Sequence, residues 1–193
     1  MALNLISSAQ LPNQYGDFTI HIFTDDAGVE YPVLTAGKLV DPVLTRIHSA
    51  CTTGDIFGSM RCDCQAQLNL AMAKIGAESC GIVIYAADHE GRGIGLSNKI
   101  RAYALQDQGH DTVTANEHLG FKADQREYKV VAEILRHFGI RAVRLLTNNP
   151  QKMAALTAQG IKVATRLPLW IADNPHNTAY LQTKRRKMGH ISS

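Results

Sequence analysis

The chain has 193 residues and a formal net charge of +3, and 45% of its residues are hydrophobic. This charge is too small to indicate a nucleic-acid partner, and the composition is that of a globular rather than a disordered or fibrous protein. No apolar run is long enough for a membrane span, and residues 1–5 lack the basic start of a signal peptide. We therefore expect a cytoplasmic protein with no membrane partner, forming a single domain over 1–193 whose last ~20 residues are flexible.

The N-terminal part has the alternating pattern of antiparallel strands. Residues 17–23 place apolar side chains on one face, and 29–35 return as a hairpin partner. Pro32 predicts that this partner is an edge strand, because proline has no N–H to donate to a neighbouring strand. A third strand is expected over 43–47, leading into a stretch rich in cysteine.

The rest of the chain alternates between helical and strand patterns. Beyond 168 it is expected to be irregular. The predicted elements are a helix ending near Gly76, a strand over 80–86, helices over 97–108 and 125–138, a strand over 143–146, a helix from Pro150 to Gly160 and a strand over 161–165. We therefore predict an α/β fold with some α+β character, in which N-terminal antiparallel strands extend a mixed sheet flanked by helices.

Three of the four cysteines, Cys51, Cys62 and Cys64, fall within fourteen positions. Zinc accepts thiolates readily, and three protein ligands would leave a position for the water of a hydrolytic site. Two alternatives stay open: a structural zinc closed by His48 or Cys80, and small buried thiols without metal. Cys80 begins a buried strand and is expected to be a core residue, so we leave it out of the metal set.

Three further stretches carry groups that could act on an anion. The glycine-rich loop 88–95 joins a strand to a helix, where it is either an anion site or a plain connection, and its first three polar residues are expected to be exposed. The stretch 147–152 is a capped helix start that could also hold a phosphate. Asp124 is either a helix cap or a partner of Arg126. From the residues alone, we predict a zinc hydrolase acting on a phosphorylated small molecule.

Taken together, these stretches resemble the GTP cyclohydrolase II family of riboflavin biosynthesis. The resemblance runs from about Leu11 to the C-terminus. The matching segments are 46–49, Cys51 with 53–55, 61–64, 90–95, 98–109, 145–150, and 183–184 with 187–190.

The resemblance implies hydrolysis of GTP with release of formate and pyrophosphate, giving 2,5-diamino-6-ribosylamino-4(3H)-pyrimidinone 5′-phosphate. It implies one zinc per subunit on Cys51, Cys62 and Cys64, Mg²⁺ with the triphosphate, and a homodimer. Asp124 matches the proton acceptor, Tyr103 a residue near the ring-opening step, and Arg126 a nucleophile, for which a charge clamp is the alternative role. The implied GTP contacts are Arg46, Ile47, His48, Ser49, Ala50, Gln67, Glu90, Gly91, Arg92, Thr112, Thr147 and Lys152.

The chain departs from the family pattern at Ala50 (usually Glu), at Gln65 (usually Gly) and over 86–89. These departures motivate an alternative, a paralogue that accepts another purine or stops at the formylamino product. A second alternative is a non-catalytic module that binds zinc and a nucleotide, or a nucleic acid through the basic run 184–187.

Overall fold

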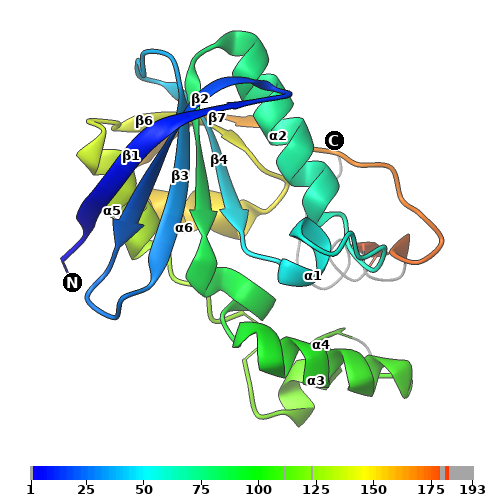
Figure 1. The fold of residues 1–193 in the computed structure, drawn as a ribbon. Coiled ribbons are helices and arrows are strands. Elements are labelled where there is room, and N and C mark those ends of the chain that lie inside the picture. The colour runs from blue at the N-terminus through cyan, green and yellow to red at the C-terminus, as the bar shows by residue number, and fades with distance from the viewer. Residues whose placement is uncertain (1, 111, 123, 179–180, 183–193) are drawn as a thin grey trace.

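The computed structural model describes residues 2–110, 112–122, 124–178 and 181–182 (Figure 1). A seven-stranded sheet has the order β1-β2-β3-β5-β4-β6-β7. Its strands are β1 (Asn4–Asn13), β2 (Gly16–Thr24), β3 (Glu30–Ala36), β4 (Val43–Ser49), β5 (Gly81–Ala86), β6 (Ala142–Leu146) and β7 (Lys162–Leu167). The helices are α1 (Thr52–Asp55), α2 (Cys64–Glu78), the 3₁₀ helix η1 (Ala87–Arg92), α3 (Gly95–Asp107), α4 (Thr112–His118), α5 (Lys129–His137) and α6 (Pro150–Ala158).

The sheet is mixed, as predicted. β1, β2, β3 and β5 pair antiparallel in that order, whereas β4 pairs parallel with both β5 and β6, and β6 pairs parallel with β7. Parallel neighbours need crossover connections, which α2, the segment from η1 to α5, and α6 supply. The carboxyl ends of β4, β5 and β6 therefore meet at one edge of the sheet.

Two apolar layers cover opposite faces of the sheet. Along β5, Ile82 and Ile84 belong to the core that includes α5 and α6, whereas Val83 belongs to the core that includes α2. Successive residues of a strand point to opposite faces, so a strand covered on both sides is apolar throughout. This explains the unbroken apolar run that predicted β5.

Two strand predictions require correction. β1 was not predicted, because all ten of its residues are exposed and it is held by its ladder to β2 rather than by an apolar face. The edge position predicted for β3 is wrong, since β3 lies between β2 and β5. Its register with β5 begins only at Val33, so Pro32 lies just outside that ladder.

The helix predicted over 125–138 begins later, at Lys129, and its N-cap is Tyr128 rather than Asp124. The Asp124 carboxylate is bonded to Arg126 instead. Cys80 is not a core residue either. It is partly exposed at the start of β5, where its Sγ donates to the Lys38 carbonyl at 3.0 Å.

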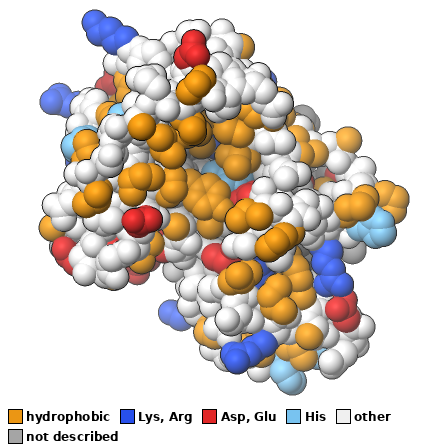
Figure 2. Space-filling view, in the orientation of Figure 1, with side chains coloured by type: hydrophobic (Ala, Val, Ile, Leu, Met, Phe, Trp, Pro, Cys, Tyr) orange, Lys and Arg blue, Asp and Glu red, His pale blue; other side chains and the backbone are white. Residues whose placement is uncertain are grey.

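The surface agrees with the modest net charge. On the face shown in Figure 2, Lys and Arg side chains are scattered toward the rim and form no continuous basic patch. Within the described part of the chain, no helix combines the length and apolar character needed to cross a membrane. The basic run 184–187 and most of the C-terminal segment predicted to be flexible lie outside the described residues.

Candidate active site

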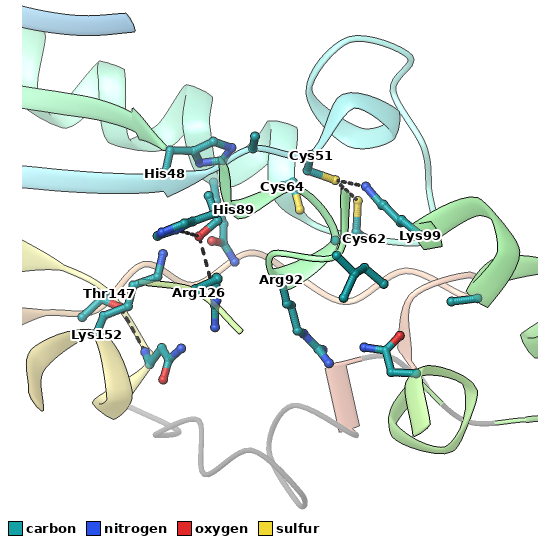
Figure 3. A pocket seen from close by; sticks show the side chains of 18 of the residues that line it. His48, Cys51, Cys62, Cys64, His89, Arg92, Lys99, Arg126, Thr147 and Lys152 are labelled. Carbon is teal, nitrogen blue, oxygen red and sulfur yellow. Dashed lines mark hydrogen bonds between the residues drawn. The ribbon is translucent and has the colours of Figure 1, made fainter. Parts of the chain in front are cut away.

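A cavity of about 150 Å³ opens where β4, β5 and β6 end (Figure 3). Loops that follow adjacent parallel strands converge at this edge, which is the usual position of sites in α/β sheets. The predicted residues that line it are Arg46, His48, Ser49, Ala50, Cys51, Cys62, Cys64, Gln67, Gly91, Arg92, Tyr103, Arg126, Thr147 and Lys152.

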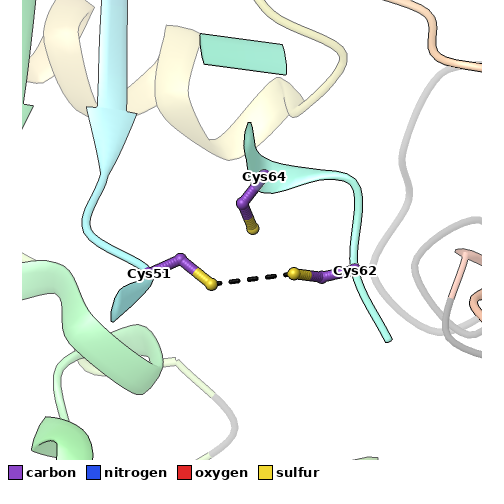
Figure 4. A group of neighbouring side chains, drawn as sticks. All are labelled: Cys51, Cys62 and Cys64. Carbon is purple, nitrogen blue, oxygen red and sulfur yellow. Dashed lines mark hydrogen bonds between the residues drawn. The ribbon is translucent and has the colours of Figure 1, made fainter. Parts of the chain in front are cut away.

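The three predicted cysteines come together beside α1. Their Sγ atoms all lie within 4.8 Å of one another, and those of Cys51 and Cys62 are 3.7 Å apart (Figure 4). Thiolates bound tetrahedrally to zinc at about 2.3 Å lie about 3.8 Å apart, so this donor set fits the metal. Among the described residues, no fourth His, Cys, Asp or Glu belongs to this group.

Asp55 organises the loop that carries Cys51. Its carboxylate accepts hydrogen bonds from the Cys51 backbone N–H, from Nε2 of His48 and from the Tyr85 hydroxyl, each at 3.0 Å. Because His48 Nε2 is held by Asp55, His48 is not positioned as a fourth metal ligand. Hydrogen bonds from the neighbouring thiols of Cys62 and Cys64, together with the charge of Lys99, lower the pKa of Cys51 despite its burial. Cys51 is therefore more readily ionised than Cys62, whose pKa is raised by its contact with Cys51.

Gly54 leaves room for the sulfur atoms. A Cβ at this position would lie 2.7 Å from Cys62 Sγ and 3.1 Å from Cys51 Sγ. Gly54→Ala is therefore expected to weaken zinc binding about 10–100-fold with every thiol retained, because overpacking costs about 1–3 kcal/mol. Competition with a chromophoric chelator measures this.

Gly58→Ala is the matched control in the same loop. Its added methyl would meet nothing closer than 3.9 Å, and its left-handed φ of +63° affects backbone stability rather than the sulfurs. Zinc affinity equal to wild type in Gly54→Ala would contradict the steric account.

A buried ion pair lies behind the cysteines. Lys99, on α3, donates to Cys51 Sγ at 3.1 Å and to Glu90 Oε1 at 2.8 Å. The other oxygen of Glu90 accepts from the backbone N–H and the hydroxyl of Thr52, both at 2.6 Å. Glu90 was expected to be exposed and to contact a nucleotide, but it is 7% exposed and its carboxylate is occupied by Lys99 and Thr52.

Tyr103 lies one turn further along α3. Its hydroxyl is 3.5 Å from Thr53 Oγ1, and Thr53 Oγ1 is 3.7 Å from Cys51 Sγ. Burial raises the pKa of Tyr103, so its hydroxyl stays protonated at neutral pH. The phenol can therefore donate a hydrogen bond beside the thiols.

Cationic side chains also line the cavity. Lys152 donates to the Ile47 carbonyl at 2.9 Å, and Arg46 donates to the Leu146 carbonyl at 3.0 Å and to Gln67 at 2.7 Å. Burial lowers the pKa of Arg46 to about 10, which leaves it charged at neutral pH. Both terminal nitrogens of Arg92 are buried without a hydrogen-bond partner among the described residues. A buried guanidinium of this kind is suited to an anionic ligand.

Asp124 and Arg126 form a bidentate ion pair, as the functional interpretation predicted. Nε of Arg126 donates to Asp124 Oδ1 at 2.9 Å, and Nη2 donates to Oδ2. Burial raises the pKa of Asp124, but the hydrogen bonds and charge of Arg126 outweigh burial and lower it overall. Asp124 is therefore a carboxylate throughout the neutral range. It lies beside a second hollow that Arg126 also lines.

His89 connects Arg126 to the sheet. Its Nε2 is 2.6 Å from the Glu127 carbonyl, which can only accept, so Nε2 carries the proton. Nδ1 then accepts from the Ser49 hydroxyl at 3.2 Å, and Ser49 accepts from Arg126 Nη1 at 3.2 Å. His89 was expected to be exposed, but it is 1% exposed.

Burial lowers the pKa of His89 from 6.5 to about 4. Between those values the unfolded chain binds a proton that the folded protein excludes, so stability falls as the pH drops from 6.5 toward 4. The loss attributable to His89 is expected to be about 3 kcal/mol. Denaturant unfolding from pH 7.5 to 4.5 measures it, with His89→Gln as reference, since Gln keeps a donor and an acceptor but does not titrate. Parallel pH profiles for the two proteins would contradict this expectation.

Ile47 and Thr112 are the two remaining predicted GTP contacts, and Ile47 is not among the described residues that line the cavity. Ile47 contributes its carbonyl to Lys152, and Thr112 begins α4 with its side chain outside the described part of the structure. His89 and Lys99 line the cavity without having been predicted. Lys99 was detectable in principle, because positions 99, 102, 103 and 106 line the cavity with helical spacing and Tyr103 was already identified.

Comparisons with known proteins identify the family of the chain. The sequence profile of GTP cyclohydrolase II matches residues 4–168. The chain is 52% identical to "GTP cyclohydrolase-2" of Azotobacter vinelandii (strain DJ), covering 99% of this chain and 93% of that protein, and 51% identical to the same-named protein of Pseudomonas putida (strain W619), covering 99% and 94%. A crystal structure of a two-domain 3,4-dihydroxy-2-butanone 4-phosphate synthase from A. baumannii aligns with a TM-score of 0.46 and 17% identity, over 88% of this chain and 40% of that one. The profile match and the two relatives establish that the chain belongs to the GTP cyclohydrolase II family.

Proposed function

We propose that the protein hydrolyses GTP in a zinc-dependent reaction, opening the imidazole ring and releasing formate and pyrophosphate. The product is 2,5-diamino-6-ribosylamino-4(3H)-pyrimidinone 5′-phosphate. One observation carries the proposal: a set of three thiols suited to zinc shares a cavity with Arg92, Arg126 and Lys152. This combination fits both parts of GTP, since the thiols can hold a Lewis acid for the base and the cations can bind the triphosphate.

Cys51, Cys62 and Cys64 would hold the zinc. When bound, the metal supplies Lewis acidity and lowers the pKa of water toward neutral pH. Three protein donors leave room for solvent. The Tyr103 hydroxyl, kept protonated by burial, would donate a hydrogen bond to the purine as its ring opens. Asp55 bonds to the Cys51 backbone and Gly54 leaves room for the sulfurs, so Cys51 Sγ can lie beside those of the other two cysteines.

For the triphosphate, Arg92 offers two buried terminal nitrogens that have no hydrogen-bond partner among the described residues, and Lys152 and Arg46 supply further positive charge. Mg²⁺ would accompany the triphosphate, bound mainly by phosphate oxygens and water. Arg126 would clamp the phosphate at which pyrophosphate leaves, and Asp124, held ionised by Arg126, would accept a proton. The roles of Arg46 and Asp124 use a charged guanidinium and an ionised carboxylate, which agree with the directions of their pKa shifts.

A second outcome of the reaction, with a different substrate or product, is motivated by Ala50. This residue lines the cavity beside Cys51 and brings no carboxylate there. A site altered in this way could accept another purine or stop at the formylamino product. A non-catalytic module is the weaker alternative, because such a protein has no use for Asp124 and Arg126 next to an open metal site.

The proposal also includes a homodimer in the cytoplasm, with no nucleic-acid or membrane partner.

The deciding experiment incubates purified, zinc-loaded protein with GTP and Mg²⁺. Formate, pyrophosphate and the product mass are measured in the same sample, together with zinc per chain. We expect one formate and one pyrophosphate per GTP and no formyl group on the product. A retained formyl group would establish the second outcome, and the absence of both formate and pyrophosphate would refute hydrolysis. Light scattering at several protein concentrations tests the dimer.

A further inference from the structure

Lys99 is a buried lysine in contact with a cysteine of the metal set. It is 8% exposed, and its ammonium lies 3.1 Å from Cys51 Sγ and 2.8 Å from Glu90 Oε1 (Figure 3). Because a flexible lysine side chain loses considerable freedom and hydration when it is buried, this position requires compensating contacts. The two contacts to Cys51 and Glu90 provide that compensation.

Glu90 determines where the ammonium points. Its second oxygen is held by the backbone N–H and hydroxyl of Thr52, the residue that follows Cys51 and begins α1. Lys99, Glu90 and the turn after Cys51 therefore form a closed set of contacts joining α3, η1 and α1. Movement of the ammonium away from Cys51 would also break its ion pair with Glu90, so the N–H is kept directed at the sulfur.

A hydrogen bond from a cation changes how much electron density a thiolate can donate to a metal. The bond orients the sulfur and draws electron density toward the donor, so less is shared with the bound ion. An ion held by three thiolates receives much electron density and is correspondingly a weak Lewis acid. Withdrawing part of that density from one ligand makes the ion a stronger one.

We infer that Lys99 is a positioning residue of the metal site, which holds the Cys51 thiolate in place and limits its electron donation to the bound ion. Glu90 orients Lys99 in this role. The inference rests on the proposed zinc site and extends it, because it assigns a function in metal tuning to two residues that do not bind the metal themselves.

The test uses the full-length protein loaded with Co²⁺ in place of zinc and contains no GTP. Lys99→Met removes the charged donor and is expected to move the thiolate-to-cobalt charge-transfer band to longer wavelength, since an unbonded thiolate gives up an electron more easily. The double variant Lys99→Met/Glu90→Gln avoids leaving a buried unpaired carboxylate and is expected to show the same shift. Arg101→Met removes the same charge from the exposed side of α3, where Arg101 donates to Asn98, and should leave the band in place.

An unmoved band in the folded double variant would overturn the inference. So would an equal shift in Arg101→Met, because the effect would then follow from net charge rather than from the hydrogen bond. With zinc and GTP, the double variant is expected to lose about 10–100-fold in kcat for ring opening. Because the cobalt spectrum is read without substrate, a protein that shows the shift but never hydrolyses GTP would refute the proposed function and leave this inference standing.

Discussion

Replacing Cys62 by Ser is expected to abolish opening of the imidazole ring. Cys62 Sγ is 3.7 Å from Cys51 Sγ and belongs to the set of three sulfurs that fits zinc. A serine hydroxyl stays protonated where a thiol ionises, so one of three donors is lost and two remain. Metal activation of water supplies several kcal/mol, so formate release should fall at least about 10³-fold. Zinc per chain, measured on the same sample, should fall with it.

Cys80→Ser provides the control, because it makes the same chemical change at a cysteine outside the set. Cys80 Sγ contacts the Lys38 carbonyl at the start of β5 and has no part in the cavity lining. Zinc content and formate release should both match the wild type. A Cys62→Ser protein that kept its zinc and its rate would show that Cys62 is not a ligand, and a loss in Cys80→Ser would show that the loss reflects thiol chemistry in general.

The apolar pattern of the sequence predicted every strand of the sheet except the exposed edge strand β1. β5 is covered on both faces, so its sequence is apolar throughout and it was found. β1 is exposed along its whole length, so it has no such pattern, and its backbone ladder to β2 leaves no mark in the sequence. The interior place of β3 depends on which strand pairs with which, and a local property such as Pro32 cannot report that.

For the site, ligand chemistry was more informative than loop composition. The spacing of Cys51, Cys62 and Cys64 predicted a shared site, and the structure brings their sulfurs together. The burial of His89 and Glu90 was missed, because a polar, glycine-rich loop normally faces solvent and their partners lie far away in the sequence. His89 bonds to the Glu127 carbonyl and Glu90 to Lys99. Such contacts arise only when the loop folds against α3 and the segment before α5.

The geometry of Arg126 bears on whether it attacks phosphorus or stabilises charge. Its guanidinium donates to both oxygens of Asp124 and to Ser49. Arginine is already protonated at any ordinary pH, and a carboxylate on two of its nitrogens favours the protonated form further. A protonated guanidinium has no free electron pair, so it is a poor nucleophile. Its fixed positive charge suits the oxygens of a phosphate that gains charge as pyrophosphate leaves.

Arg126→Met is therefore expected to slow pyrophosphate release roughly 10³–10⁵-fold, the range for losing an arginine that stabilises phosphoryl transfer. Arg144→Met should keep the wild-type rate, since Arg144 pairs with Glu78 away from the cavity. Wild-type enzyme quenched during turnover in alkaline denaturant, which preserves a P–N bond, should carry no guanylyl group when its intact mass is measured, because a clamp forms no covalent bond. A guanylyl adduct present in the wild type and missing from Arg126→Met would identify Arg126 as the nucleophile and show that the guanidinium gives up its proton in spite of Asp124.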